Sequence, residues 1–163
     1  MNLKSSNTIA ITGASGFLGS ILFDYLYKEL GETQFVLFQH QTPISLETQE
    51  RVKIVSGSFS DEKFLENSLF GVNILIHMAA ATHSRNTMNY KEVNVQNTSN
   101  ILKSVELAKI DHFVYVSTTA LGEACGEYGA SKEEAELLIK KSKIPFTVAR
   151  LSEVYGRKSD EGL

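Results

Sequence analysis

The chain has 163 residues, of which 42% are hydrophobic and 21% are charged, and its formal net charge is −3 at pH 7. This composition predicts one soluble globular domain with a sizeable core, and it lacks the basic excess that a nucleic-acid or anionic-membrane partner requires. The single cysteine, Cys125, excludes an internal disulfide and a metal site built from several cysteines, so we expect no metal.

Six short runs of residues are predicted to form strands. Four of them, TIAIT, FVLF, NILIHM and HFVYV, are almost entirely apolar, without the alternation of a half-exposed strand. Strands of this kind are buried on both faces, which favours a parallel sheet covered by helices. The predicted strands span residues 8–12, 34–39, 52–55, 73–78, 112–117 and 146–150.

Longer amphipathic segments between these runs are predicted to form helices. Gly31 stands where the first helix should stop, Asp61 where the second should be capped, and Pro145 where the last has already ended. The alternation of strands and helices predicts right-handed βαβ units, and therefore an α/β fold with a doubly wound, mostly parallel sheet. The predicted helices span residues 17–30, 61–71, 89–110 and 131–143.

The segment TGASGFLG, residues 12–19, places three glycines where the first strand turns into the first helix. In such a unit Gly13 permits a tight turn, Gly16 admits a pyrophosphate, and Gly19 lets helix and strand pack closely. The helix that begins near Phe17 would direct its N-terminal N–H groups and the positive end of its dipole at the phosphates. The alternative is a purely structural loop, but the position between a strand and a helix favours nucleotide binding.

Four later segments follow the glycine loop along the chain: GVNILIHMAAAT (71–82), NVQNTSNILKSV (94–105), YGASK (128–132) and ARLSEVYG (149–156). Together with the spacing TGxxGxxG, this ordered set resembles the extended short-chain dehydrogenase/reductase family, of the NAD-dependent epimerase/dehydratase type. The resemblance covers nearly the whole chain and implies a Rossmann fold with NAD or NADP as its cofactor. The residues that it assigns to the cofactor are Gly13, Ser15, Gly16, Phe17, Leu18, Gly19, Gln39, His40, Ser58, Phe59, Ala79, Ala80, Tyr128 and Lys132.

Tyr128 and Lys132 in YGASK resemble the family's Y-x-x-x-K catalytic motif. Four residues apart at the start of a predicted helix, the two side chains share a face. The ammonium, together with an oxidised nicotinamide, would lower the pKa of the phenol, so that Tyr128 exchanges a proton with a substrate hydroxyl during hydride transfer. The resemblance also implies that Lys132 holds the nicotinamide ribose. The alternative is a surface tyrosine and lysine on an amphipathic helix.

The resemblance also implies a serine or threonine just after the fifth predicted strand, whose hydroxyl orients the substrate oxygen. Aligning HFVYVST by its strand assigns this catalytic role to Thr118, with Ser117 and Thr119 as alternatives. Hydroxyls at a strand end are also common caps, which is the competing structural interpretation.

Two segments depart from the family pattern. Gln39 or His40 stands where dinucleotide binders often place an acidic residue for NAD or an arginine for NADP, so the choice of cofactor stays open. Ser58 and Phe59 stand where many relatives have a Gly-Asp pair, so Phe59 is expected to approach the adenine through its backbone.

Other polar residues near the predicted site are interpreted as bystanders. Cys125 lies between Thr118 and Tyr128, in a segment that is short compared with many sugar-nucleotide enzymes and leaves a small or an open roof. His83 is interpreted as a solvated loop residue, with a place in the substrate cleft as its alternative, and His77 as a strand-edge residue.

The chain stops at Leu163, whereas extended family members continue past the V-Y-G segment into a substrate-binding subdomain. We therefore expect residues 1–163 to be the NAD(P)-binding domain of a longer enzyme, with that subdomain absent or truncated. The alternative is a short natural chain with limited catalysis. The expected function is that of an NAD(P)-dependent epimerase, dehydratase or reductase that acts by hydride transfer, with a nucleotide sugar as its substrate.

A non-catalytic NAD(P)-binding sensor or scaffold with the same fold is the second hypothesis, which the missing subdomain favours and the Tyr–Lys pair opposes. The helices over about 87–109 and 128–142 would pair in a homodimer, as they often do in relatives. The N-terminus shows no signal-peptide pattern, and no apolar run approaches the roughly 20 residues that cross a bilayer. We therefore expect a cytoplasmic protein with no membrane and no nucleic-acid partner.

Overall fold

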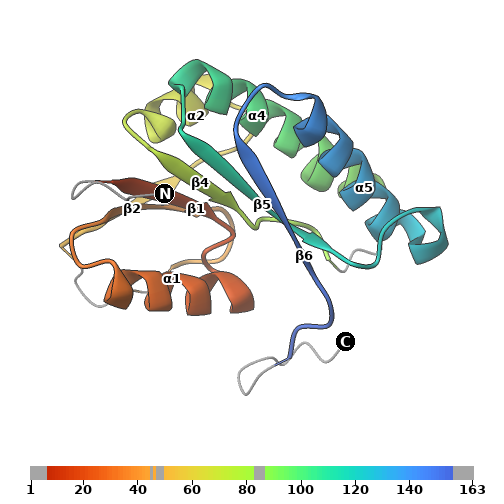
Figure 1. Ribbon diagram of the computed structural model, residues 1–163, viewed down its shortest axis with the longest axis horizontal. Coiled ribbons are helices and arrows are strands. Elements are labelled where there is room, and N and C mark those ends of the chain that lie inside the picture. The colour runs from red at the N-terminus through yellow and green to blue at the C-terminus, as the bar shows by residue number, and fades with distance from the viewer. Residues whose placement is uncertain (1–6, 45, 47–49, 83–86, 156–163) are drawn as a thin grey trace.

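The computed structural model describes residues 7–44, 46, 50–82 and 87–155 of the chain. Its centre is a sheet of six parallel strands in the order β3-β2-β1-β4-β5-β6 (Figure 1). Every predicted strand forms, and each end lies within one residue of its prediction. The strands are β1 Thr8–Thr12, β2 Gln34–Gln39, β3 Val52–Ser56, β4 Ile74–His77, β5 His112–Thr118 and β6 Phe146–Leu151.

Helices connect the strands and cover both faces of the sheet. Figure 1 shows α1 on one face and α2, α4 and α5 on the other. The doubly wound α/β fold is therefore confirmed, and the direction of winding reverses between β1 and β4, which is where such sheets bind their ligands. The helices are α1 Phe17–Glu29, α2 Glu62–Leu69, α3 Thr87–Tyr90, α4 Asn97–Ala108 and α5 Gly126–Lys141.

Two of the helical predictions need correction. The single helix predicted over residues 89–110 is divided into α3, the π-helical segment Lys91–Gln96, and α4. The π-helical segment contains the buried Asn94, whose side chain bonds to a neighbouring loop, and such widened turns are frequent at functional sites. The last helix begins at Gly126 rather than at residue 131, because the 3-10 turn Glu123–Cys125 leads directly into it.

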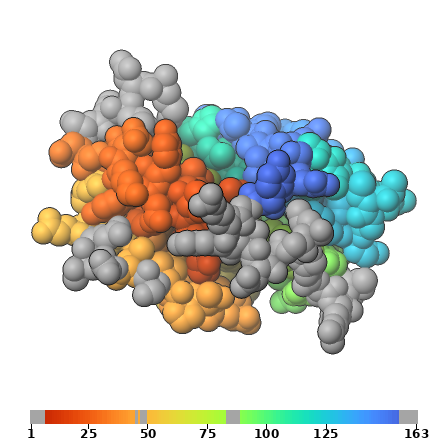
Figure 2. All heavy atoms as spheres, turned by 90° about the horizontal axis from the view of Figure 1, so that it is seen from below, coloured from red at the N-terminus to blue at the C-terminus, as the bar shows by residue number. Residues whose placement is uncertain are grey.

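Two apolar cores fill the space between the sheet and its helices. The core under α1 is formed by side chains of α1, of the loop before it and of the central strands: Ile9, Ile11, Ala14, Phe23, Phe35, Leu37 and Ile76. The core under α2, α4 and α5 includes Leu65, Leu69, Ile101, Val105, Phe113, Tyr115, Ala135 and Ile139. Figure 2 shows the face on which α1 lies, with the C-terminal strand β6 beside it. Within the described ranges, no helix is long and apolar enough to cross a membrane.

Candidate active site

The glycine loop between β1 and α1 lies against the end of β4. Gly13 has φ +74°, a left-handed conformation that other residues rarely adopt, and a Cβ there would lie 2.7 Å from the backbone nitrogen of Ala79. Both observations require glycine, so Gly13 makes the tight turn expected of the first glycine. Ala79 and Ala80 follow β4 and are half-buried beside this turn.

The third glycine allows α1 to begin directly against the loop. A Cβ on Gly19 would collide with the carbonyl oxygen of Gly13 and would lie 2.9 Å from its carbonyl carbon. Gly16 has more room, because an added Cβ would meet only that same oxygen, at 3.3 Å. In the described part of the chain, the space beside Gly16 is therefore otherwise open.

The backbone amides of the loop are not equally free to bind an anion. The N–H of Gly16 donates to the carbonyl oxygen of Gly13 at 3.1 Å, and the N–H of Ser20 makes the first bond of α1, to Gly16, at 2.9 Å. The N–H groups of residues 17–19 come before that bond and have no acceptor within the helix. We expect these amides and the helix dipole to face a bound phosphate, while Gly16 contributes space rather than a donor.

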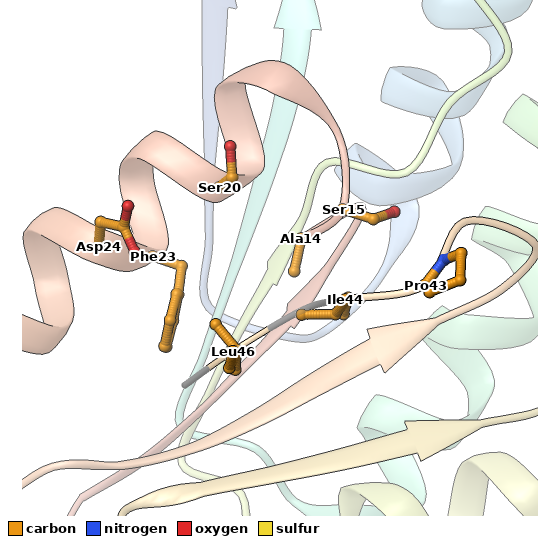
Figure 3. Close-up of a pocket in the computed structure, with 8 residues that line it drawn as sticks. All are labelled: Ala14, Ser15, Ser20, Phe23, Asp24, Pro43, Ile44 and Leu46. Carbon is orange, nitrogen blue, oxygen red and sulfur yellow. The ribbon is translucent and has the colours of Figure 1, made fainter. Parts of the chain in front are cut away.

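A small pocket opens beside this loop, between α1 and the segment that follows β2 (Figure 3). Gln39 holds that segment, since its Oε1 accepts the N–H of Ile44 at 2.7 Å and its Nε2 donates to Oγ of Ser56 at 3.3 Å. A contact between Gln39 and a ribose stays a prediction, and these two bonds leave one N–H of Nε2 and one lone pair of Oε1 for it. His40 is exposed. The pocket is lined by Ala14, Ser15, Ser20, Phe23, Asp24, Pro43, Ile44 and Leu46.

A chain of hydrogen bonds fixes the end of β4 beneath the loop. Oγ1 of Thr98 donates to the carbonyl oxygen of Asn94 at 2.7 Å, so it must accept from Nε2 of His77 at 3.0 Å. Nδ1 of His77 is then unprotonated and accepts the hydroxyl proton of Thr12 at 2.6 Å. The oxygen of that hydroxyl accepts the N–H groups of residues 78 and 79, both at 3.2 Å.

His77 is therefore a neutral imidazole with its proton on Nε2. Burial lowers its pKa to about 3, and the ammonium of Lys132 acts in the same direction. The sequence-based interpretation of His77 as a strand-edge residue is wrong, because β4 is a central strand and the side chain is 1% exposed.

Two asparagines hold the loops on either side of this chain of bonds. Oδ1 of Asn94 accepts the N–H of Ala81 at 2.8 Å, and its Nδ2 donates to the carbonyl oxygen of Ala81 at 3.1 Å. The same Nδ2 donates to Oγ of Ser131 on α5 at 3.0 Å. Nδ2 of Asn100 donates to the carbonyl oxygen of Phe59 at 3.1 Å. Sequence reasoning uses this segment only as a family signature and misses that its amides position the loops after β3 and β4.

The two predicted adenine-side residues differ in exposure. Ser58 is exposed and shares a hydrogen bond of 2.7 Å with the hydroxyl of Ser60. Phe59 is half-buried, and the centroid of its ring lies 5.8 Å from that of Phe38 and 6.4 Å from that of His77. The ring thus packs into the core, which leaves the backbone of Phe59 as the part that could meet an adenine.

Tyr128 is half-buried in the first turn of α5, with its ring centroid 6.2 Å from that of Tyr90. Burial raises the pKa of Tyr128, and Tyr90 acts in the same direction. The lowering expected from Lys132 together with an oxidised nicotinamide stays a prediction. Tyr128 is a protonated phenol at neutral pH.

The ammonium of Lys132 lies against β5. Its Nζ donates to the carbonyl oxygen of Val116 at 2.8 Å and lies 4.0 Å from the centroid of the Tyr115 ring. The residue is 2% exposed, and burial lowers its pKa to about 7, whereas Glu136 one turn later raises it. Burial thus favours the neutral form of Lys132, and the Glu136 carboxylate favours the charged form.

The three hydroxyls after β5 differ in what they touch. Ser117 is buried and donates to Oε1 of Glu136 at 2.8 Å, so its proton is not available to a substrate. Thr118 is half-exposed, and its Oγ1 accepts the N–H of Ala120 at 3.1 Å, which leaves the hydroxyl proton free to donate. Thr119 is exposed. These contacts support Thr118 rather than Ser117 as the orienting group, and that role stays a prediction.

Sequence patterns alone miss a buried carboxylate beside Lys132. Glu136 is 1% exposed and accepts from Nε of Arg150 at 2.9 Å and from its Nη2 at 2.7 Å. A glutamate four residues after a lysine is typical of a solvated helix face, so nothing in the local sequence marks Glu136 as buried. The sequence feature that could have pointed to a buried carboxylate is its partner Arg150, a charged residue in the segment ARLSEVYG.

Two further residues from the sequence analysis are Cys125 and His83. Cys125 is exposed in the turn before α5. His83 lies outside the described residues. Over the ranges that the structure describes, no three His, Cys, Asp or Glu side chains are grouped so that they could hold a metal ion.

The close approach of α1 to the loop can be tested with one methyl group. We expect Gly19→Ala to lower the free energy of unfolding by roughly 2–3 kcal/mol, because the methyl group meets backbone that cannot move aside. Denaturant titration measures the effect. Gly31→Ala is the matched control, since a Cβ there has no neighbour within 4 Å, and its effect should stay below about 0.5 kcal/mol. Equal losses in both variants would contradict the packing.

The chain is similar in sequence to a known family and to several characterised proteins. A family model described as the 3-beta hydroxysteroid dehydrogenase/isomerase family matches residues 10–142. The chain is 27% identical over 192 residues to dTDP-D-glucose 4,6-dehydratase of Dictyostelium discoideum, covering 92% of this chain and 44% of that protein. It is 26% identical over 164 residues to ceramide reductase of Caulobacter vibrioides, covering 100% of this chain and 51% of that protein. The chain thus spans about half the length of the curated relatives it matches.

Solved structures match the fold over nearly the whole chain. The Bordetella bronchiseptica enzyme WbmH in complex with NAD+ matches with a TM-score of 0.82 at 20% identity, over 96% of this chain and 59% of that chain. UDP-glucuronic acid 4-epimerase from Bacillus cereus in complex with NAD matches with a TM-score of 0.79 at 25% identity, over 91% of this chain and 58% of that chain. These matches confirm the Rossmann-like architecture.

Proposed function

The chain belongs to the 3-beta hydroxysteroid dehydrogenase/isomerase family, within the extended short-chain dehydrogenases/reductases, and from this premise we propose that it binds NAD and serves hydride transfer. The family resemblance read from the sequence motifs is confirmed. The observation that carries the proposal is the glycine loop, where Gly13 and Gly19 bring the start of α1 against the end of β1 and leave the amides of residues 17–19 without helical acceptors.

The geometry of the loop fits a diphosphate. Side chains at Gly13 or Gly19 would collide with the backbone of Ala79 and of Gly13 and would push α1 away from the loop, whereas an added Cβ on Gly16 meets only the carbonyl oxygen of Gly13. An anion at the start of α1 gains N–H donors and the positive end of the helix dipole. The adenosine half would lie toward β2, beside Ser15 and the pocket of Figure 3, at the carboxyl ends of the strands.

NAD is the cofactor that we propose, and two structural neighbours, WbmH and the UDP-glucuronic acid 4-epimerase, are complexes with it. Gln39 contributes no carboxylate at the end of β2, and its amide is engaged with Ile44 and Ser56. Gln39 therefore supplies no charge that repels a 2′-phosphate, and among the described residues that line the pocket the acidic one is Asp24, on α1.

The chemistry that NAD supplies when bound is the acceptance or donation of a hydride. Tyr128, a protonated phenol in this structure, can donate its proton to a substrate oxygen in the reductive direction. Thr118 orients that oxygen with its free hydroxyl proton. The ammonium of Lys132 has three N–H donors. One donates to the carbonyl oxygen of Val116, and two remain for a ribose hydroxyl. In the oxidative direction Tyr128 must first lose its proton, which a positive charge beside it favours.

A nucleotide sugar is the substrate that we propose. The relatives include the dTDP-D-glucose 4,6-dehydratase and a protein described as a putative UDP-glucose 4-epimerase from Methanocaldococcus jannaschii. We further propose that residues 1–163 form the dinucleotide-binding domain of a longer enzyme, a proposal supported by the share of the relatives that the chain spans.

A non-catalytic NAD-binding sensor with the same fold is the second candidate. We also keep a cytoplasmic location and a homodimer as proposals. Leu107 on α4 and Leu137 on α5 are exposed apolar side chains on helices of the predicted dimer face. Light scattering should then give twice the 18.0 kDa of one chain, and a concentration-independent value of 18.0 kDa would refute the dimer.

Replacing Tyr128 by phenylalanine separates the enzyme from the sensor. We expect Tyr128→Phe to reduce turnover of nucleotide sugars by roughly 10²- to 10⁴-fold, because general acid–base catalysis is lost, while NADH affinity is retained. NADH fluorescence measures binding and its absorbance measures turnover. Tyr25→Phe, on the exposed side of α1, is the matched control and should leave both unchanged.

Each outcome of this experiment has a defined meaning. Turnover in the Tyr128→Phe variant equal to that of the unmodified protein would refute the role of the phenol. Tight NADH binding without turnover of any nucleotide sugar would favour the sensor. Failure of NADH to bind at millimolar concentration would refute the proposal as a whole.

A further inference from the structure

Glu136 is the centre of a buried polar cluster that joins three elements. Its carboxylate accepts from Ser117 at the end of β5 at 2.8 Å, and from Nε and Nη2 of Arg150 on β6 at 2.9 and 2.7 Å. Lys140, one turn later on α5, adds a contact of 3.3 Å. The carboxylate is 1% exposed, whereas the side chains of Arg150 and Lys140 are each 49% exposed. The acid is thus the buried member, and its partners reach it from the surface.

Lys132 stands one turn before Glu136 on the same face of α5. Its ammonium donates to the carbonyl oxygen of Val116, the residue that precedes Ser117, so lysine and glutamate bind adjacent residues of β5. Among the described residues, the titratable groups near Lys132 are Glu136 and Tyr128 from α5, the Tyr115 ring from β5 and His77 from β4. Of these only Glu136 is negatively charged at neutral pH, because burial keeps Tyr115 and Tyr128 neutral phenols and His77 a neutral imidazole.

We propose that Glu136 is a positioning residue, which locks α5 to the ends of β5 and β6 and thereby holds Lys132 in place as a cation beside the reaction centre. The proposal rests on the proposed function only for the role of Lys132 in catalysis. The effect of Glu136 on the charge of Lys132 is a property of the protein without dinucleotide and can be measured there. Burial of an ammonium favours its neutral form, and a neighbouring carboxylate opposes that effect.

The charges around Glu136 predict an effect on the titration of Lys132 in addition to the link between α5, β5 and β6. Arg150 and Lys132 are two positive charges near the same carboxylate, and the contacts of Arg150 are the first cause of a Glu136 pKa lowered to about 2. Glu136 in turn favours the charged form of Lys132. Changes on either side of the carboxylate should therefore move the titration of Lys132 in opposite directions, which a purely structural link between α5 and β6 would not do.

Glu136→Gln tests this with little change of shape, because an amide oxygen can still accept from Ser117 and from one nitrogen of Arg150. We expect the pKa of Lys132 to fall by about one pH unit in the dinucleotide-free protein. Titration of the lysine side-chain NMR signals measures it, with the Lys132 signal identified by its loss in Lys132→Met. Glu134→Gln removes the same charge from an exposed position on α5 and should leave the pKa of Lys132 unchanged.

Arg150→Gln is the second variant. It leaves the Glu136 carboxylate with one positive neighbour fewer, so the pKa of Lys132 should rise. In the enzyme assay, the pH at which turnover declines as Lys132 loses its proton should move in the same direction as each measured pKa.

Opposite shifts in Glu136→Gln and Arg150→Gln, with none in Glu134→Gln, would support the proposal. An unchanged pKa of Lys132 in a folded Glu136→Gln variant would overturn it. If that variant does not fold, an unchanged or lowered value in Arg150→Gln would overturn it. Because these titrations use no dinucleotide, their outcome is independent of NADH binding, which tests the proposed function separately.

Discussion

The contact between Gly19 and the carbonyl group of Gly13 is the constraint on which the candidate site depends. Only because neither residue carries a side chain can α1 begin where β1 has just ended. That geometry places the first turn of a helix, with its unbonded N–H groups, over the carboxyl edge of a parallel sheet. A helix start displaced by one methyl group would no longer present those amides at the point where the winding of the sheet reverses.

Near this contact, buried polar side chains link the strand ends to the helices by hydrogen bonds. The hydroxyl of Thr12 ties the end of β1 to the backbone after β4, and His77 continues the link to α4. Asn94 extends it to α5 through Ser131. Each group has a definite donor or acceptor role, and a buried network of this kind is costly unless it is fully paired. The candidate cofactor edge is therefore held by bonds that admit one arrangement of the loops.

The sequence predicts the scaffold more completely than the site. The strands are found to within one residue, and four of the six are apolar runs bounded by turn residues. Asp61 caps α2 by accepting the N–H of Phe64 at 3.0 Å. The glycine loop is predicted because its spacing has a local meaning. His77 and Glu136 are missed because their partners lie far away in sequence, as Thr12 and Arg150 do. A local pattern cannot show that a polar side chain is buried opposite such a partner.

The most direct test of the account is an amide NMR titration of the protein with NAD. If the helix terminus holds the diphosphate, the N–H signals of residues 17–19 shift in a saturable way, while that of Gly16, bonded to Gly13, stays protected from exchange with solvent. Binding that leaves residues 17–19 unperturbed would contradict the central claim, as would no binding at millimolar NAD.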